Sequence, residues 1–257
     1  MQTCRTEIFA APPRPVVVSM MDDRATVIRE LIAAQPARSG GTAGYLRRVC
    51  ESAASTLSAS GTGISVLTDD GVRGVCAASD PVSEHVEELQ FILGEGPCLD
   101  AFDSRRPVLV ADLAGEATTR WPMYAPAAQH GGVHAVFAFP LQIGAARLGV
   151  LDVFRDRAGG LSDHHLADAL RFAEVTVAGL LDRQEDAGAG ARDGLLDAVG
   201  NRAELFQAQG MVMVQIEGTI AEAMARMRAF AYAESRSLGE VARDVVARAL
   251  SFEPDRP

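Results

Sequence analysis

Apolar residues in the first two thirds of the chain follow two spacings, which separate helices from strands. From Gly44 to about Ser60 they recur three and four positions apart, the period of an amphipathic helix. Short β-branched or aromatic runs, bounded by Gly, Asp or Pro, then predict strands at residues 64–67, 72–77, 107–111, 135–141 and 148–154. Turn residues at 69–71 favour a hairpin between the first two strands. With further helices near 83–93 and 121–130, the pattern predicts an α+β fold with helices flanking a mainly antiparallel sheet.

The rest of the chain shows helical periodicity only. A helix capped by Ser162 and running to about Gln184 carries an apolar stripe, which either packs against a second copy of the chain or docks on its own sheet. Three shorter helices follow, near 195–214, after Thr219 and after Ser237. The last two begin with the S/T-x-x-E pattern of a capping box, completed by Glu222 and Glu240.

These patterns divide the chain into five segments. Prolines and glycines punctuate residues 1–43, so we expect mostly a flexible tail with one short helix that begins near Asp22. We place an α+β domain at 44–184, a linker at 185–194, a small all-α domain of three helices at 195–251 and a second tail at 252–257. A three-helix unit of this size is near the lower limit for independent stability, so packing on a partner copy would help it.

Composition and charge exclude several classes of protein. No apolar run reaches the roughly 18 residues that a membrane helix needs, and the first residues do not resemble a secretion signal, so we expect a soluble cytoplasmic protein without membrane contact. The four cysteines lie far apart without a CxxC pair, so we expect neither disulfides nor a metal site. The net charge of -10 disfavours broad, electrostatically driven binding to nucleic acid.

Two segments of the predicted α+β domain are candidates for chemistry. In Gly94-Glu95-Gly96-Pro97-Cys98-Leu99-Asp100, the glycines and the proline fix a tight backbone path around Cys98 and Asp100. The segment is either a rigid turn with a buried thiol or the wall of a small-molecule pocket with a redox-sensitive thiol. Trp121 and Tyr124 follow, and such amphipathic aromatic residues either line a pocket or pack in the core.

The combination of these segments resembles the GAF domains of actinobacterial GAF–ANTAR regulators. The resemblance covers residues 44–184 and includes Gly94–Asp100, Pro107–Leu113, Arg120–Pro122, Val136–Leu141 and Leu148–Asp152. It implies a small-molecule pocket over an antiparallel sheet, often in a homodimer, and leaves the ligand and any cofactor open. We expect the ligand-binding residues to be Cys98, Asp100, Trp121, Tyr124 and Phe137.

The C-terminal helices resemble the ANTAR domain, through Ala208–Met213, Glu222-Ala223, Met227-Arg228, Ala231 and Leu238–Ala242. The resemblance implies binding to paired RNA hairpin loops and prevention of transcription termination. Loop recognition uses stacking and hydrogen bonds to splayed bases, for which we select Gln209, Gly210, Arg228, Tyr232 and Arg236. From Leu195 onward seven arginines face nine acidic residues, and Gln209, Val214 and Gln215 stand where many members of that family are charged.

These observations predict a signal-responsive RNA-binding regulator that senses a small molecule or redox state and has no catalytic activity. One alternative is a signalling scaffold whose C-terminal helices bind another protein, which their acidic balance favours. The other is a thiol reductase of the GAF type, which needs several cysteines around the pocket, whereas only Cys98 and Cys76 are candidates. The adjacent His164 and His165 point about 100° apart on a helix, which favours surface or capping roles over metal ligation.

Overall fold

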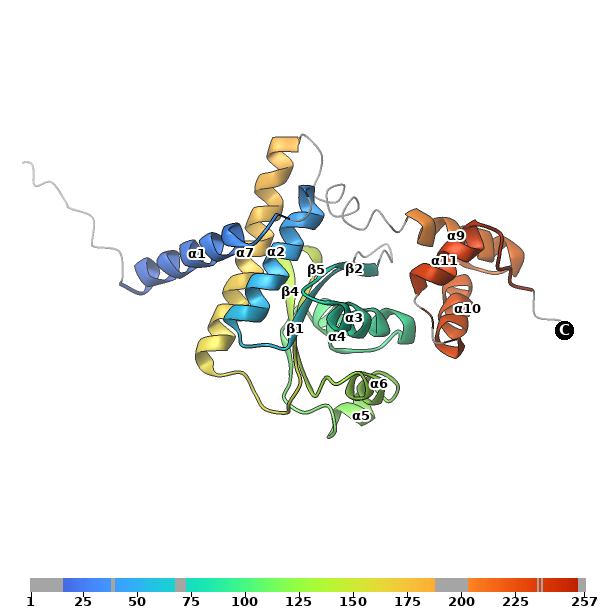
Figure 1. The fold of residues 1–257 in the computed structure, drawn as a ribbon, viewed down its shortest axis with the longest axis horizontal. Helices are drawn as coiled ribbons and strands as arrows, with labels where there is room; N and C mark the ends of the chain where they lie inside the picture. The colour runs from blue at the N-terminus through green and yellow to red at the C-terminus, as the bar shows by residue number, and fades with distance from the viewer. Residues whose placement is uncertain are drawn as a thin grey trace, which may run out of the picture.

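The computed structural model describes residues 16–37, 40–67, 73–187, 203–234, 236 and 238–253. Its centre is a five-stranded antiparallel sheet in the order β2-β1-β5-β4-β3 (Figure 1). The strands are β1 (Gly61–Leu67), β2 (Arg73–Ala78), β3 (Val108–Val110), β4 (Ala135–Ile143) and β5 (Ala146–Arg155). Because successive residues of a strand point to opposite faces, each strand contributes side chains to two separate layers.

Two helices cover one face of the sheet, α2 (Gly41–Thr56) and α7 (Asp163–Ala187), and α1 (Val16–Ala34) packs against these two helices. They enclose the largest apolar core, to which β4 contributes Phe139 and β5 contributes Leu151 and Val153. The apolar stripe of α7 packs mainly into this core, since Ala173, Val177 and Leu180 are buried there. These residues of α7 therefore pack within the chain itself, against its own sheet and helices.

Four helices lie on the opposite face: α3 (Pro81–Leu93), α4 (Pro97–Ser104), α5 (Ala117–Arg120) and α6 (Tyr124–His130). The start of α3 is fixed by Asp80, whose side chain accepts hydrogen bonds from the backbone N–H groups of Val82 and Ser83. Its end is fixed by Gly94 in the left-handed conformation (φ 73°), which glycine adopts without strain. We refer to α2–α7 and the five strands as the sheet domain.

The C-terminal helices are α9 (Ala203–Gln215), α10 (Ile220–Ala233) and α11 (Leu238–Val246). The predicted capping box at the start of α10 is present, with Thr219 and Glu222 each accepting a backbone N–H of the other. A separate apolar core joins the three helices around Val212, Met227 and Val241. This core also takes in Ile92 from α3, so the C-terminal helices pack on the sheet domain next to α3.

Several elements differ from the sequence prediction. The N-terminal helix is not short: it runs for 19 residues from Val16, ahead of Asp22, and buries Ile28 and Ile32 in the main core. Arg24 and Asp168 form an ion pair that ties this helix to α7. The helix predicted at 121–130 is present as α6, but it begins at Tyr124, and a separate short helix, α5, precedes it at Ala117–Arg120. The predicted turn at 69–71, the capping residue Ser237 and most of the linker lie outside the described residues.

No helix in the described part of the chain has both the length and the apolar character needed to cross a membrane.

Candidate functional site

A cluster of polar side chains is buried between the sheet and α3. Gln90 of α3 is its centre, because its side-chain amide donates hydrogen bonds to Glu87 Oε2 (3.2 Å) and Asp152 Oδ2 (2.8 Å). Ser65 of β1 donates its hydroxyl proton to Glu87 Oε1. Ser65, Glu87, Gln90 and Asp152 are all fully buried. We call these four residues, together with Cys98 and Tyr124, the buried polar site.

The Gly94–Asp100 segment places Cys98 in this site. The backbone N–H of Cys98 donates to Gln90 Oε1 at 2.7 Å, so the same glutamine joins α3 to the first turn of α4. Gly96 has φ 145°, and a Cβ atom there would lie only 2.4 Å from Gln90 Oε1. Only glycine fits this position, which explains the tight path that the sequence suggested. The segment is a rigid turn, and it brings the buried thiol next to two carboxyl groups.

The start of α6 holds Tyr124 against the same site. Glu95 Oε1 accepts the backbone N–H groups of Met123 (2.6 Å) and Tyr124 (2.8 Å), which fixes the entry into this helix. The Tyr124 side chain is fully buried, and its hydroxyl has no hydrogen-bond partner among the described residues. The same holds for Asp152 Oδ1. A buried polar atom without a partner is costly, so these two atoms mark a place where a bound species is expected.

Burial dominates the electrostatics of the site. It raises the pKa of Glu87, although hydrogen bonds from the surrounding groups oppose the change. It also raises the pKa of Asp152 far above the ordinary value, and the charge of Glu87 adds to the effect. The pKa of Tyr124 is raised by burial and then by the charges of Asp152, Glu87 and Cys98. Both carboxyl groups are therefore harder to ionise here than in water.

The structure brings together only part of the predicted ligand-binding set. Cys98 and Tyr124 belong to the buried polar site, and Trp121 is buried in the apolar cluster that contains Tyr124. Asp100 is partly exposed and forms an ion pair with Arg120 (2.6 Å), whose guanidinium lies 4.7 Å from the centre of the Trp121 ring. Phe137 points to the other face of the sheet and packs under α2 and α7, so it does not belong to the buried polar site.

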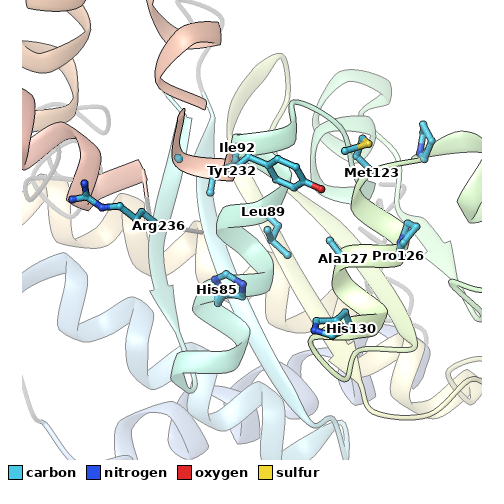
Figure 2. A pocket seen from close by; sticks show the side chains of 11 residues that line it. His85, Leu89, Ile92, Met123, Pro126, Ala127, His130, Tyr232 and Arg236 are labelled. Carbon is cyan, nitrogen blue, oxygen red and sulfur yellow. The ribbon is translucent and has the colours of Figure 1, made fainter. Parts of the chain in front are cut away.

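A cavity of about 540 Å³ lies between the sheet domain and the C-terminal helices (Figure 2). We call it the interface pocket. Helix α3 contributes His85, Leu89 and Ile92, and α10 contributes Ala231 and Tyr232. Pro122 and Met123, just before α6, also line the pocket, as do Pro126, Ala127 and His130 of α6. Arg236, from the segment after α10, completes the lining.

Three of the predicted RNA-binding residues lie where the sheet domain meets the C-terminal helices. Tyr232 and Arg236 line the interface pocket, with 51% of Tyr232 exposed and Arg236 paired with Asp244 at 2.6 Å. Arg228 lies one turn before Tyr232, and its Nη1 would be 3.2 Å from a Cβ atom at Gly94 of the sheet domain. The side of α10 that carries these residues is therefore turned toward α3.

The other two predicted RNA-binding residues lie on α9. The Gln209 side-chain amide donates to the backbone oxygen of Ile220 (3.0 Å), which links α9 to the start of α10. Gly210 is within α9, and a Cβ atom there would contact nothing within 4 Å among the described residues. Gln209 therefore has a structural role in this state, and the helix does not need glycine at position 210 for packing.

Sequence reasoning missed Glu87, Gln90 and Asp152, which complete the buried polar site. Glu87 and Gln90 sit on the amphipathic helix α3, where a polar residue ordinarily faces solvent. Asp152 carried a usable signal, because it interrupts the apolar run Leu148–Phe154 in a strand covered on both faces. Glu88 was also missed, and it accepts a hydrogen bond from the backbone N–H of Leu238 at 3.0 Å.

A sheet of this order, with helices on both faces and a buried polar site under one of them, makes up an α+β domain. The profile described as "GAF domain" matches residues 43–180, which is more than half of the chain. The protein belongs to the GAF domain family, whose members are sensory and signalling domains that bind small molecules. The match ends before the C-terminal helices, so their resemblance to ANTAR domains stays a prediction.

Solved GAF structures are similar to the chain at low sequence identity. The GAF domain of an Acinetobacter phosphoenolpyruvate-protein phosphotransferase is 16% identical (TM-score 0.49), over 66% of this chain and 97% of that one. Its counterpart from Coxiella burnetii is also 16% identical (TM-score 0.49), over 65% and 96%. A type II free methionine-R-sulfoxide reductase from Thermoplasma acidophilum is 17% identical (TM-score 0.44), over 53% and 90%. No curated protein matches the sequence.

Proposed function

We propose that the chain is a ligand-responsive regulator in which the GAF domain controls access to the C-terminal helices, and that those helices bind RNA. The observation that carries this proposal is the interface pocket, which is lined by residues of the GAF domain and of α10 together. A molecule that enters the pocket contacts both parts. Its binding energy therefore changes how tightly they pack, which is the requirement for a ligand-driven shift between two states.

The contacts around the pocket are few enough to be reversible. Ile92 of α3 enters the C-terminal apolar core, and Glu88 accepts the first backbone N–H of α11. A carboxylate at a helix N-terminus is stabilised by the helix dipole, typically by about 0.3–1 kcal/mol. Together with Arg228 at Gly94, these contacts form a small junction of the kind that permits relative motion of domains.

The lining of the interface pocket favours a partly apolar anion as the ligand. Leu89, Ile92 and Met123 supply apolar surface, whereas His85 and His130 supply ring nitrogens and the Arg236 guanidinium is paired with Asp244. None of the residues that line the pocket is acidic. Figure 2 shows the Tyr232 ring reaching from α10 over the pocket, where it can cover a bound molecule.

RNA binding requires the face of α10 that the GAF domain covers. Arg228 and Tyr232 on this face, and Arg236 in the segment after α10, are the residues that can stack on bases or bind phosphate. In the described state they contact or face the GAF domain, so docking and RNA binding compete for them. We propose that ligand binding shifts this competition, and that the freed helices bind paired hairpin loops and act on transcription termination.

The test is binding of the full-length protein to an RNA with two hairpins, against a scrambled RNA, at two salt concentrations. We expect specific binding that weakens with salt. Replacing Tyr232 with Leu removes a stacking surface worth about 1–3 kcal/mol per base and should lower the affinity by at least about fivefold. Tyr232→Phe, which keeps the aromatic ring, is the matched control and should bind like wild type.

One observation favours a protein partner instead. Val214 is 70% exposed at the end of α9, and Ile220 is 59% exposed at the start of α10, so two large apolar side chains face solvent on the C-terminal helices. Absence of RNA binding by the wild type would favour this second function. A salt-insensitive complex with a partner, weakened by Val214→Ser, would then support it.

We also propose that the protein is not an enzyme. A thiol reductase needs cysteines that can exchange electrons with one another, but Cys50 and Cys76 pack in the core on one face of the sheet while Cys98 lies on the other. Absence of turnover on small sulfoxides is the expected result. Homodimerisation remains a further proposal, and a monomeric mass by light scattering would contradict it.

A further inference from the structure

The buried polar site has the composition of a metal site. Glu87, Cys98 and Asp152 are fully buried, and one ligand atom from each lies within 4.8 Å of the others. Donors around one tetrahedral ion at 2.0–2.3 Å lie about 3.3–3.8 Å apart, so a contraction of roughly 1 Å would bring these atoms to bonding distance. We propose that Glu87, Cys98 and Asp152 bind a single divalent transition-metal ion of the Zn²⁺ class.

The environment of the two carboxyl groups supports a cation. Two buried carboxylates close together repel each other and are poorly solvated, unless a positive charge lies between them. The hydrogen-bond partners described for Glu87 and Asp152 are Gln90, Ser65, Cys98 and each other, and none of them is a lysine, arginine or histidine. Within the described part of the chain, neither carboxyl group therefore has a cationic hydrogen-bond partner to offset its charge.

A second observation begins with a residue outside the three proposed ligands. The Tyr124 hydroxyl is fully buried beside the same three residues and has no hydrogen-bond partner in the described structure. Asp152 Oδ1 is likewise buried and unpartnered. Three protein donors leave a coordination position open for a water molecule or a small exogenous ligand. A water bound there would give both atoms a partner.

The donor set selects the type of ion. Ca²⁺ takes 6–8 oxygen ligands, and Mg²⁺ demands octahedral geometry with oxygen donors and retained waters, which this buried set with a sulfur donor does not supply. A thiolate with two carboxylates suits Zn²⁺ and its chemical neighbours Co²⁺ and Fe²⁺. Cys98 is in the first turn of α4, where the helix dipole favours the thiolate. The expectation of no metal rested on cysteine spacing, which detects only ligands that are close in the sequence.

The experiment is titration of the metal-free full-length protein with Co²⁺ and then with Zn²⁺. We expect one equivalent of Co²⁺ to bind with the charge-transfer absorption of a thiolate ligand, and Zn²⁺ to displace it. The affinity should increase with pH, because the ligands must lose protons when the metal binds. No stoichiometric binding by the wild type would overturn the proposal.

Variants assign the ligands. Cys98→Ser should abolish the charge-transfer absorption, whereas Cys76→Ser, on the opposite face of the sheet, should retain it. Asp152→Asn keeps the size of the side chain and should raise the Kd by at least about tenfold. If Cys98→Ser does not fold, the affinity of Asp152→Asn for the metal tests the assignment of the ligands instead. Binding that none of the site variants alters would place the metal elsewhere and refute the assignment. The proposal does not depend on RNA binding.

Discussion

The two faces of the sheet bury side chains of different kinds, although the same strands supply both. On β5, Leu151 and Val153 pack into a predominantly apolar core under α2 and α7, while Asp152 between them enters the buried polar site. An apolar residue at position 152 would have satisfied the fold at lower cost, because a buried carboxyl group weakens stability unless it is compensated. The first face therefore stabilises the fold, whereas the second combines apolar clusters with a buried polar site.

The largest expected effect is on the apolar face. Phe139 is fully buried in the core under α2 and α7, so Phe139→Ala should lower the free energy of unfolding by about 3–5 kcal/mol. Chemical denaturation of the full chain measures the change. Leu170→Ala on α7, where 41% of the side chain is exposed, should cost less than about 1 kcal/mol. Equal costs would contradict the assignment of the core.

A smaller loss is expected where the backbone shapes the polar face. Gly96→Ala introduces a Cβ atom against the Gln90 side chain at a φ that L-residues rarely adopt, and should cost about 2–3 kcal/mol. Because Gln90 holds both Cys98 and Asp152, the variant should also weaken metal binding. Gly160→Ala, whose Cβ would meet nothing within 4 Å, is the matched control in thermal unfolding and Co²⁺ titration.

In the metal-free protein, Asp152→Asn should increase the free energy of unfolding, whereas the changes above lower it. The pKa of Asp152 is raised in the folded state by burial and by the charge of Glu87. Native stability is therefore greatest below the unfolded carboxyl pKa and falls as the pH rises toward the folded pKa. Removing this ionisation should make the variant more stable than wild type at pH 8, by about 1–3 kcal/mol.

Unfolding of both proteins across pH 4–9, with a chelator present, checks this expectation. The wild type should lose stability relative to the variant as the pH rises. Parallel curves would mean that Asp152 ionises without cost and that the polar face is not under electrostatic strain.

Much of the fold follows from local pattern. The five strands, α3 and the long helix α7 were predicted because hydrophobic period and turn residues agree over those segments. Helix α1 was underestimated because the prolines before Val16 suggested a loop, although a proline immediately before a helix is also a start signal. The start of α6 at Tyr124 was not predicted because its cause is tertiary: Glu95, from another loop, accepts the first backbone N–H groups of the helix.

The candidate site was less accessible to sequence reasoning. Cys98 and Tyr124 stood out as unusual residue types in an unusual segment, but their partners Glu87 and Gln90 come from an ordinary amphipathic helix. Phe137 was assigned to the wrong face because its orientation depends on the register of β4 against β5, which a single strand does not reveal. The interface pocket depends on the packing of α10 against α3, for which no local pattern exists.

The central claim is that the GAF domain covers the RNA-binding side of the C-terminal helices, and Glu88→Gln tests it most directly. The neutral amide can still accept the Leu238 N–H but loses the charge interaction with the start of α11. We predict two-hairpin RNA binding about two- to fivefold tighter than wild type, since docking weakens by about 0.4–1 kcal/mol. Glu84→Gln, exposed one turn earlier on α3, should bind like wild type. Equal RNA affinity in Glu88→Gln and wild type, or no binding by either, would contradict the account.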